Sequence, residues 1–283
     1  MNTIIRKSNI AAMQSFDNLF IEMSAKYCNQ KCKNCYIDFP LTKNVKDFIP
    51  IDTVKKALID TKTENLQCIY LSGAEPMTHP DFNAILRLCI KKSNVCICTN
   101  GSFINEKKAR FIKNVENASD KKIFFKLSFA HWDELQNDSV RSRGSYRQNF
   151  YALKCLDKYD FVNIINISNY YNENHNVIID NFANKLNDSG IENAIIQINE
   201  WAGNNVDDSA FDNIDRLEFE TDCMTSRTLT SKGVFSCPFL ANDYRGRLGS
   251  DFTDFSKTVR LETNFCSACL KNKEKMFSFD FEE

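Results

Sequence analysis

The chain has 283 residues, 43% of them hydrophobic and 26% charged, and 36 Lys and Arg against 37 Asp and Glu leave a formal net charge of −1. This composition is typical of a soluble enzyme and excludes disordered, collagen-like and coiled-coil chains, and the balanced charge gives no overall basic surface for nucleic acid. No apolar run approaches the roughly 18 residues that span a membrane, and the N-terminus has no signal-peptide core. We therefore expect a cytoplasmic protein that binds neither nucleic acid nor a membrane, in a compartment that keeps its 12 Cys reduced.

Short apolar runs of strand length alternate with longer segments that carry apolar residues at helical spacing. The predicted strands are 19–23, 68–72, 95–99, 123–129, 162–167 and 194–198, and the predicted helices are 51–62, 80–92, 106–117, 145–158 and 177–189. This alternation predicts a parallel sheet with crossover helices. Six units fall short of the eight of a closed barrel, so we expect an α/β fold, a partial (β/α)6 TIM-like barrel with its site at the carboxyl ends of the strands.

Beyond Asp215 the pattern changes to polar segments, Gly turns and paired Cys. We therefore expect two domains, the barrel over residues 1–214 and a small Cys-rich domain over residues 215–283.

Three cysteines, Cys28, Cys32 and Cys35, form a CxxxCxxC group in a polar stretch directly after the first predicted strand. Burial does not explain thiols in such surroundings, so a metal centre is the better interpretation. Three thiolates can hold three irons of a cubane and leave the fourth iron open, or they can form three corners of a zinc site that a remote residue such as His79 completes.

Four further cysteines, Cys223, Cys237, Cys266 and Cys269, lie near the C-terminus, and the last two form a CxxC pair. Four thiolates make a closed ligand set, and their spacing fits both a four-cysteine zinc site and a fully ligated [4Fe-4S] cluster.

The five remaining cysteines sit among apolar neighbours and are expected to pack as small buried hydrophobes; they are Cys68, Cys89, Cys96, Cys98 and Cys155. Cys96 and Cys98 share one face of a predicted strand. One of them could instead line the barrel interior and donate a hydrogen atom.

Three motifs follow successive predicted strands in order: CxxxCxxC, then Gly73-Ala-Glu-Pro76, then Thr99-Asn-Gly101. Together, over residues 16 to about 198, they resemble the radical S-adenosylmethionine (SAM) superfamily. The resemblance implies a [4Fe-4S] cluster on the three N-terminal cysteines, with SAM chelated to its open iron by amino and carboxylate groups. It also implies a flavodoxin- or ferredoxin-type reductant, reductive cleavage of SAM, and hydrogen abstraction by the resulting 5'-deoxyadenosyl radical.

The same resemblance implies the SAM contacts. The turn from Ser72 to Pro76 would surround the methionyl amino group with Glu75 as anionic partner, and Arg141, or else Arg143, would reach the carboxylate. Ala74 stands where the family usually has a second Gly, and Asn34 stands where an aromatic often covers the adenine, a part left to Tyr36, Phe39 or Asn100. The predicted SAM-binding residues are Tyr36, Ser72, Gly73, Ala74, Glu75, Asn100, Ser128 and Arg141.

The C-terminal cysteines, with Cys237-Pro and Cys266-Ser-Ala-Cys269, resemble the SPASM/twitch extension of radical SAM enzymes, and Trp201-Ala-Gly203 fits the same subgroup. No cysteine follows Cys269, so the resemblance implies one auxiliary [4Fe-4S] cluster held by four Cys, which favours electron transfer over substrate binding. Zinc is the alternative occupant.

Three functional hypotheses follow. By resemblance to twitch-type deoxy-scyllo-inosamine dehydrogenases, the chain is an oxidoreductase that abstracts hydrogen from a small polar molecule, an aminosugar or cyclitol, and passes the second electron to the auxiliary cluster. Candidate acid–base residues are Lys126, His131 and Glu200, with Asn166 as a further contact. The second hypothesis is a peptide-modifying maturase that crosslinks or epimerises residues. The third, a non-catalytic iron-sulfur electron carrier, is disfavoured by the retained SAM-site motifs.

Overall fold

The computed structural model describes residues 9–37, 47–61, 66–201, 203, 208–211, 220–241, 243–273 and 275–279. Phe39 and the predicted domain boundary between residues 214 and 215 lie outside these ranges.

Six parallel strands form the framework of the molecule. They are β2 (Asn18–Ser24), β3 (Cys68–Gly73), β4 (Asn94–Thr99), β5 (Ile123–Phe129), β6 (Asn163–Asn169) and β7 (Ala194–Glu200), and they pair in chain order. Every residue of β2 is buried, as expected of a parallel strand covered on both faces. The predicted α/β fold is confirmed, and each strand lies within two residues of its predicted bounds.

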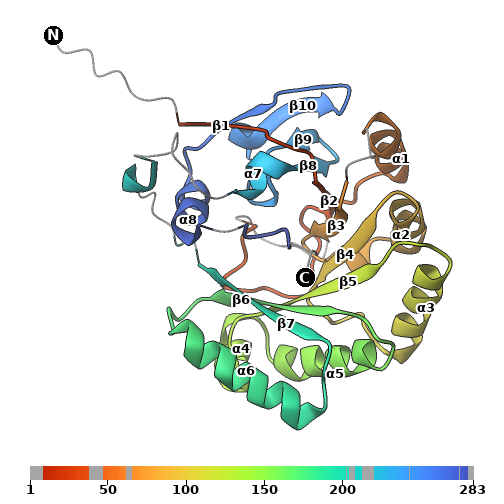
Figure 1. The fold of residues 1–283 in the computed structure, drawn as a ribbon, viewed down its shortest axis with the longest axis vertical. Helices are drawn as coiled ribbons and strands as arrows, with labels where there is room; N and C mark the ends of the chain where they lie inside the picture. The colour runs from red at the N-terminus through yellow and green to blue at the C-terminus, as the bar shows by residue number, and fades with distance from the viewer. Residues whose placement is uncertain are drawn as a thin grey trace.

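Helices cover the outer side of the curved sheet (Figure 1). They are α1 (Ile51–Asp60), α2 (Phe82–Ile90), α3 (Glu106–Asn117), α5 (Ser145–Asp157) and α6 (His175–Ser189), with a short α4 (Glu134–Val140) that the periodicity did not predict. α4 begins after Asp133, whose side chain accepts a hydrogen bond from the Gln136 amide, and this cap satisfies one of the free N–H groups of the first turn. The helix brings Arg141, at its C-terminal end, to the strand ends.

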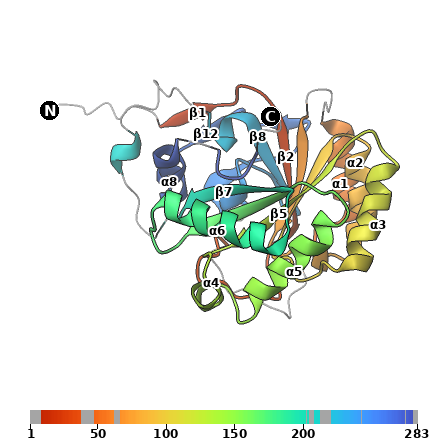
Figure 2. The same ribbon diagram turned by 60° about the horizontal axis from the view of Figure 1, so that its bottom comes forward.

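The C-terminal part of the chain extends the same sheet. β8 (Ser226–Thr230) pairs in parallel with β2, and β9 (Gly233–Phe235), β10 (Arg247–Asp251) and β11 (Asp254–Phe255) follow in antiparallel order. β1 (Ile10–Ala12) and β12 (Thr258–Arg260) form a separate two-stranded ribbon, which lies near α8 (Asn264–Asn272) in Figure 2. Short helices complete this part: η2 (Pro76–Thr78), η3 (Asp208–Phe211), α7 (Asp222–Thr225), η5 (Pro238–Leu240) and η6 (Tyr244–Gly246).

Two apolar layers lie on opposite faces of the parallel sheet. The larger core packs between the strands and the outer helices. On the inner face a smaller cluster of Phe20, Cys68, Tyr70, Cys96 and Ile164 packs against Phe277 and Phe279 from the end of the chain. The barrel interior is therefore filled in part by a C-terminal segment.

The predicted burial of the five non-motif cysteines is confirmed for four of them, Cys68, Cys89, Cys96 and Cys155, whereas Cys98 is only half-buried. Among the helices that the structure describes, none is long and apolar enough to cross a membrane.

Gly101, in the turn after β4, offers a test of how tightly the strand ends are packed. Its φ is +76°, and an added Cβ would lie 2.6 Å from the Oδ1 atom of the buried Asn149. Gly144 has a similar φ of +82° but open space around its Cα. We expect Gly144→Ala to cost about 1 kcal/mol of backbone strain and Gly101→Ala to cost clearly more, because it adds a steric clash. Urea unfolding of both variants measures the loss in the free energy of unfolding. An equal loss in the two variants would contradict the close contact between Gly101 and Asn149.

Candidate functional site

A cavity of about 180 Å³ opens at the carboxyl ends of the parallel strands. Because these ends meet at one edge of the sheet, motifs distant in sequence come together there. The lining includes Cys28, Gln30, Cys32, Asn34, Cys35 and Tyr36 after β2, Ser72, Gly73 and Ala74 at β3, Thr99 and Asn100 after β4, Lys126 and Ser128 on β5, Arg141, and Asn166, Ser168, Asn199 and Glu200 from β6 and β7.

The three N-terminal cysteines face this cavity together. Cys28 Sγ accepts hydrogen bonds from the Gln30 amide at 3.4 Å and from Asn100 Nδ2 at 3.7 Å. Burial raises the pKa of Cys28 to about 12 and that of Cys35 to about 11. Without a bound cation these thiols hold their protons at neutral pH, whereas a metal would take them as thiolates and release the protons.

The zinc site considered from the sequence requires a residue such as His79 beside these three cysteines, and the structure does not place His79 there. His79, the residue named to complete zinc, lies outside the cavity lining. Its Nε2 is 2.8 Å from the Ile49 carbonyl and its Nδ1 accepts the Asp81 amide.

The turn after β3 is built so that only a glycine fits at its first position. Gly73 has φ +105°, and a Cβ there would lie 2.4 Å from the Ser24 carbonyl oxygen. The next amide, that of Ala74, donates to the same carbonyl at 2.7 Å. Ala74 is not among the residues with positive φ, so its backbone accepts the methyl group, and its amide links the ends of β2 and β3.

Glu75 is positioned differently from the expectation. Its side chain is only 1% exposed and does not line the cavity. The carboxylate accepts hydrogen bonds from Met77 N, Thr99 Oγ1 and Asn100 N at 3.1, 2.7 and 2.8 Å. Burial raises the pKa of Glu75, and these three donors act in the opposite direction. Glu75 therefore links the ends of β3 and β4 through hydrogen bonds and does not line the cavity.

Arg141 lines the cavity, and one N–H group of its guanidinium has no hydrogen-bond partner. The side chain is 7% exposed, and Nη2 donates to Gln30 Oε1 at 3.3 Å, but Nε is buried without a hydrogen-bond partner. A buried N–H of a cation is costly unless an acceptor meets it. An anionic ligand in the cavity, such as a carboxylate, would supply that acceptor. Arg143, the second candidate from the sequence, is exposed.

The side of the cavity formed by β6 and β7 is polar. Asn199 Nδ2 donates to Asn166 Oδ1 at 2.8 Å. Glu200 Oε1 lies 2.6 Å from His175 Nε2, and Asn169 Nδ2 donates to the same oxygen at 3.3 Å. These two neighbours hold the Glu200 carboxylate, and Glu200 is one of the residues that line the cavity.

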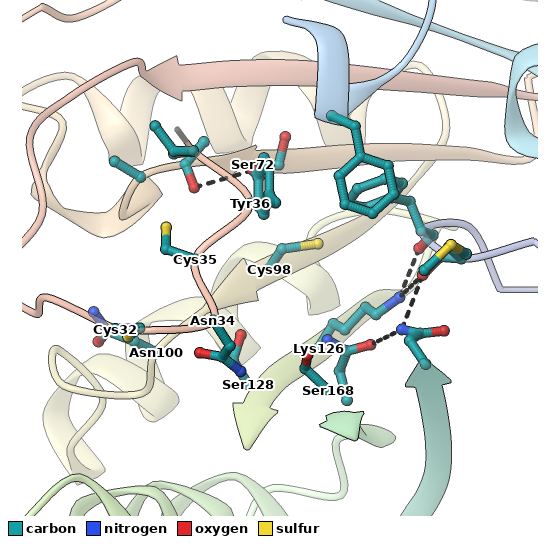
Figure 3. A pocket seen from close by; sticks show the side chains of 18 of the residues that line it. Cys32, Asn34, Cys35, Tyr36, Ser72, Cys98, Asn100, Lys126, Ser128 and Ser168 are labelled. Carbon is teal, nitrogen blue, oxygen red and sulfur yellow. Dashed lines mark hydrogen bonds between the residues drawn. The ribbon is translucent and has the colours of Figure 1, made fainter. Parts of the chain in front are cut away.

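The side chains of the two other predicted acid–base residues, Lys126 and His131, already have polar partners within the protein. Lys126 lines the cavity, but Nζ donates to the carbonyls of Phe277 and Met276 at 2.8 and 3.3 Å (Figure 3). Burial lowers the pKa of this lysine. His131 is absent from the lining; its Nε2 is 3.2 Å from Glu173 Oε2, and its Nδ1 accepts the amide of Asp133. Of the three candidates, Lys126 and Glu200 line the cavity, and the ammonium group of Lys126 is already bound by two carbonyl groups.

A second, smaller cavity is lined by all four C-terminal cysteines, Cys223, Cys237, Cys266 and Cys269. Hydroxyl groups reach two of them: Thr221 Oγ1 is 3.1 Å from Cys223 Sγ, and Thr263 Oγ1 donates to Cys266 Sγ at 3.2 Å. Such hydrogen bonds to sulfur are found around thiolate-bound metal centres.

Arg227 places a positive charge beside this second cavity. The side chain is 0% exposed, and its Nη1 donates to the carbonyls of Cys223 and Ser226 at 2.7 and 2.6 Å. Its Nε is buried without a partner. Burial lowers the pKa of Arg227 to about 10, while Cys223 and Cys237 act to raise it. A buried guanidinium here fits an anionic group on the cysteines, as a thiolate-bound metal centre would be.

The sequence analysis did not identify two residues from the end of the chain that line these cavities. Met276 lines the first cavity and Phe277 lines both. The available signal was the apolar run Met276-Phe-Ser-Phe279 in an otherwise polar chain end.

Comparison with known proteins identifies the family. The profile of the radical SAM superfamily matches residues 24–182, more than half of the chain, whereas comparison with curated proteins gives no match.

Solved structures share the fold. SuiB of Streptococcus suis bound to the precursor peptide SuiA aligns with a TM-score of 0.62 and 15% identity over 87% of this chain, which spans 64% of the SuiB chain. Histidine-tagged anSMEcpe with bound AdoMet aligns with a TM-score of 0.62 and 16% identity over 91% of this chain and 83% of its own. BtrN in complex with AdoMet and 2-DOIA reaches only 0.48 at 13% identity, over 84% of this chain and 79% of its own. None of these comparisons confirms the expected likeness to a specific dehydrogenase.

Substitution of Glu75 tests how much its hydrogen bonds between the strand ends contribute to stability. In Glu75→Gln one acceptor oxygen becomes an NH2 group that faces donors, so we expect a loss of about 1–3 kcal/mol in the free energy of unfolding. Glu106→Gln, at an exposed carboxylate paired with Lys158, should cost at most about 0.5 kcal/mol. Urea unfolding compares the two variants. A Glu75 variant as stable as the control would show that these hydrogen bonds contribute little to the free energy of unfolding.

Proposed function

Since the chain belongs to the radical SAM superfamily, we propose that it is an enzyme that cleaves SAM at a [4Fe-4S] cluster on Cys28, Cys32 and Cys35 and oxidises a small polar molecule of the aminosugar or cyclitol type. The choice of substrate rests on the polar residues that β6 and β7 contribute to the cavity lining, Asn166, Ser168, Asn199 and Glu200. Carboxamides, a hydroxyl and a carboxylate suit a ligand rich in hydroxyl and amino groups.

The cluster and SAM, when bound, supply one electron and a 5'-deoxyadenosyl radical that removes a hydrogen atom from the substrate. The chain's own residues hold these groups. The free Nε of Arg141 is suited to the SAM carboxylate, and the Ser72–Ala74 turn presents backbone to the same cavity. The Gln30 amide and the Asn100 side chain donate to Cys28, and such donors tune a cluster's potential.

Glu200 is the proposed base. After the hydrogen atom leaves the carbon, the substrate hydroxyl gives its proton to the Glu200 carboxylate, and one electron leaves the substrate, which gives a ketone. His175 and Asn169 orient the carboxylate from outside the cavity. Tyr36, with rings of Phe239 and Phe277 packed edge-on at 5.7 and 5.6 Å between centroids, limits the access of water.

An acceptor for that electron is proposed at Cys223, Cys237, Cys266 and Cys269, as an auxiliary [4Fe-4S] cluster. The buried charge of Arg227 supports an anionic centre there. Phe239, Phe265 and Phe277 line both this cavity and the first one, so the two sites lie on opposite sides of one aromatic wall. A flavodoxin- or ferredoxin-type protein is the proposed reductant.

A peptide substrate is the second candidate, because an adjoining groove of about 560 Å³ shares Cys35, Tyr36 and Trp201 with the site. Asp243, Tyr244 and Arg245 form its outer part, and the exposed ring of Tyr244 could contact an extended chain. Tight binding of a peptide without turnover of aminosugars would favour this function.

Metal analysis tests the two-cluster proposal. Anaerobic iron and sulfide determination with Mössbauer spectroscopy should find about eight irons per chain, two cubanes, and about four after Cys28, Cys32 and Cys35 are replaced by Ala. That variant should no longer form 5'-deoxyadenosine from SAM. Cys89→Ala, at a buried cysteine that lines neither cavity, serves as control. About four irons with one zinc would remove the electron acceptor and exclude the oxidation as written.

Substitution of Arg141 tests the SAM contact. Arg141→Met removes one charge-assisted hydrogen bond, so we expect SAM to bind roughly ten- to a hundredfold more weakly. Arg143→Met, at the exposed neighbour, should bind as the parent chain does. Equilibrium dialysis with SAM on anaerobic protein of matched iron content measures both, and equal affinities would assign the carboxylate contact to another residue.

A further inference from the structure

A segment near the C-terminus packs inside the barrel. Residues Lys275–Phe279, called the plug here, follow α8 and run along the inner face of the parallel sheet. The Gln197 and Asn199 side chains on β7 donate to the carbonyls of Lys275 and Met276 at 3.4 and 3.1 Å. The backbone of the plug is thus attached to β7, one of the two strands that form the polar side of the cavity.

Two buried opposite charges hold the plug between them. Asp222 is 2% exposed, and its carboxylate accepts the amides of Met276, Phe277 and Ser278 at 2.8, 2.8 and 2.9 Å and the Ser278 hydroxyl at 2.6 Å. Lys126, 4% exposed, donates to the carbonyls of Met276 and Phe277. The same peptide groups therefore satisfy an anion through their N–H and a cation through their C=O, which each buried charge requires.

The far end of the plug is anchored below the site. The Phe279 amide donates to the Tyr70 hydroxyl at 2.7 Å, and the Phe277 ring packs edge-on against Phe20 at 5.9 Å between centroids. Phe20 and Tyr70 are themselves fully buried and stacked at 4.5 Å. The plug thus occupies barrel space below the main cavity.

We infer that the plug is a specificity-determining element: it sets the depth of the main cavity, and the Met276 and Phe277 side chains set the size of the molecule that fits beside the three cysteines. Both side chains line that cavity. On its other side, Met276 Sδ lies 3.2 Å from Cys269 Sγ, and Phe277 lines the second cavity. The same two residues therefore form part of the wall, with Phe239 and Phe265, between the main cavity and the C-terminal cysteines. The size selection rests on the proposed function, whereas the plug itself can be tested without turnover.

The clamp formed by Asp222 and Lys126 is tested by hydrogen–deuterium exchange of the full chain, purified anaerobically. The amides of residues 276–278 should be protected in the parent chain. In Asp222→Asn, which cannot accept all four bonds, they should exchange at least about tenfold faster. Because Asp222 adjoins Cys223, Lys126→Met on β5 provides a second variant that leaves the cysteines in place, and it should also speed exchange of the plug.

Asp243→Asn is the matched control, because Asp243 also accepts a backbone amide, that of Arg245, but on the surface. It should leave the exchange of residues 276–278 unchanged. Plug amides that exchange within seconds in the parent chain, or that stay protected in both clamp variants, would overturn the inference.

Size selection is tested with Phe277→Ala. The probes are a panel of free aminosugars and cyclitols and their benzyl ethers, with 5'-deoxyadenosine and product formation as readouts. We expect the ratio of kcat/KM for a benzyl ether to that for its parent compound to rise about tenfold or more in the variant, while Phe103→Ala, at a half-exposed ring outside the cavity, leaves the ratio unchanged. An unchanged ratio in Phe277→Ala would overturn the role in selection. If the parent chain turns over none of these compounds, the proposed substrate class is wrong. The exchange experiment still tests whether Asp222 and Lys126 hold the plug in place.

Discussion

Burial of positive charge is the constraint on which this interior depends. Lys126, Arg141 and Arg227 are each less than 10% exposed, and a cation removed from water is tolerated only where acceptors or anions meet it. The three are met in different ways. Carbonyls of the plug satisfy Lys126, whereas Arg141 and Arg227 each keep a buried Nε with no partner among the described residues. Arg141 lines the main cavity, and Arg227 donates to the backbone carbonyl of Cys223 beside the second cavity, so a buried positive charge lies near each group of cysteines.

The strands and the cysteine groups could be predicted from the sequence because their signals are local. A buried parallel strand is a continuous apolar run such as Leu19–Met23, and three cysteines within eight residues in a polar stretch have few structural explanations. The role of Glu75 is different in kind. An acid in a strand-end turn can face a ligand or a neighbouring strand, and the register of β3 with β4 decides between these by bringing Thr99 and Asn100 to the carboxylate.

The same reasoning explains Lys126 and the plug. A lysine near the end of a barrel strand is a reasonable catalytic candidate, but its partners are contributed from about 150 residues further along the chain. No periodicity in the final residues shows where they go, because a short irregular segment carries neither a helical nor a strand pattern. His131 shows the reverse case: its position after β5 predicted a place in the site, and contacts with Glu173 and Asp133 hold it outside the lining.

Asp222 links the two halves of the site. Its backbone precedes Cys223, a residue of the second cavity, while its carboxylate holds the plug that walls the first. β8 begins directly after this short helix and pairs with β2, the strand that leads into the CxxxCxxC segment. The segment that holds Cys223 is therefore connected to the plug through Asp222 and to the barrel edge through β8. For the electron transfer proposed between the two sites, this arrangement would hold Phe277 in the wall between the two cavities, because buried hydrogen bonds fix its backbone.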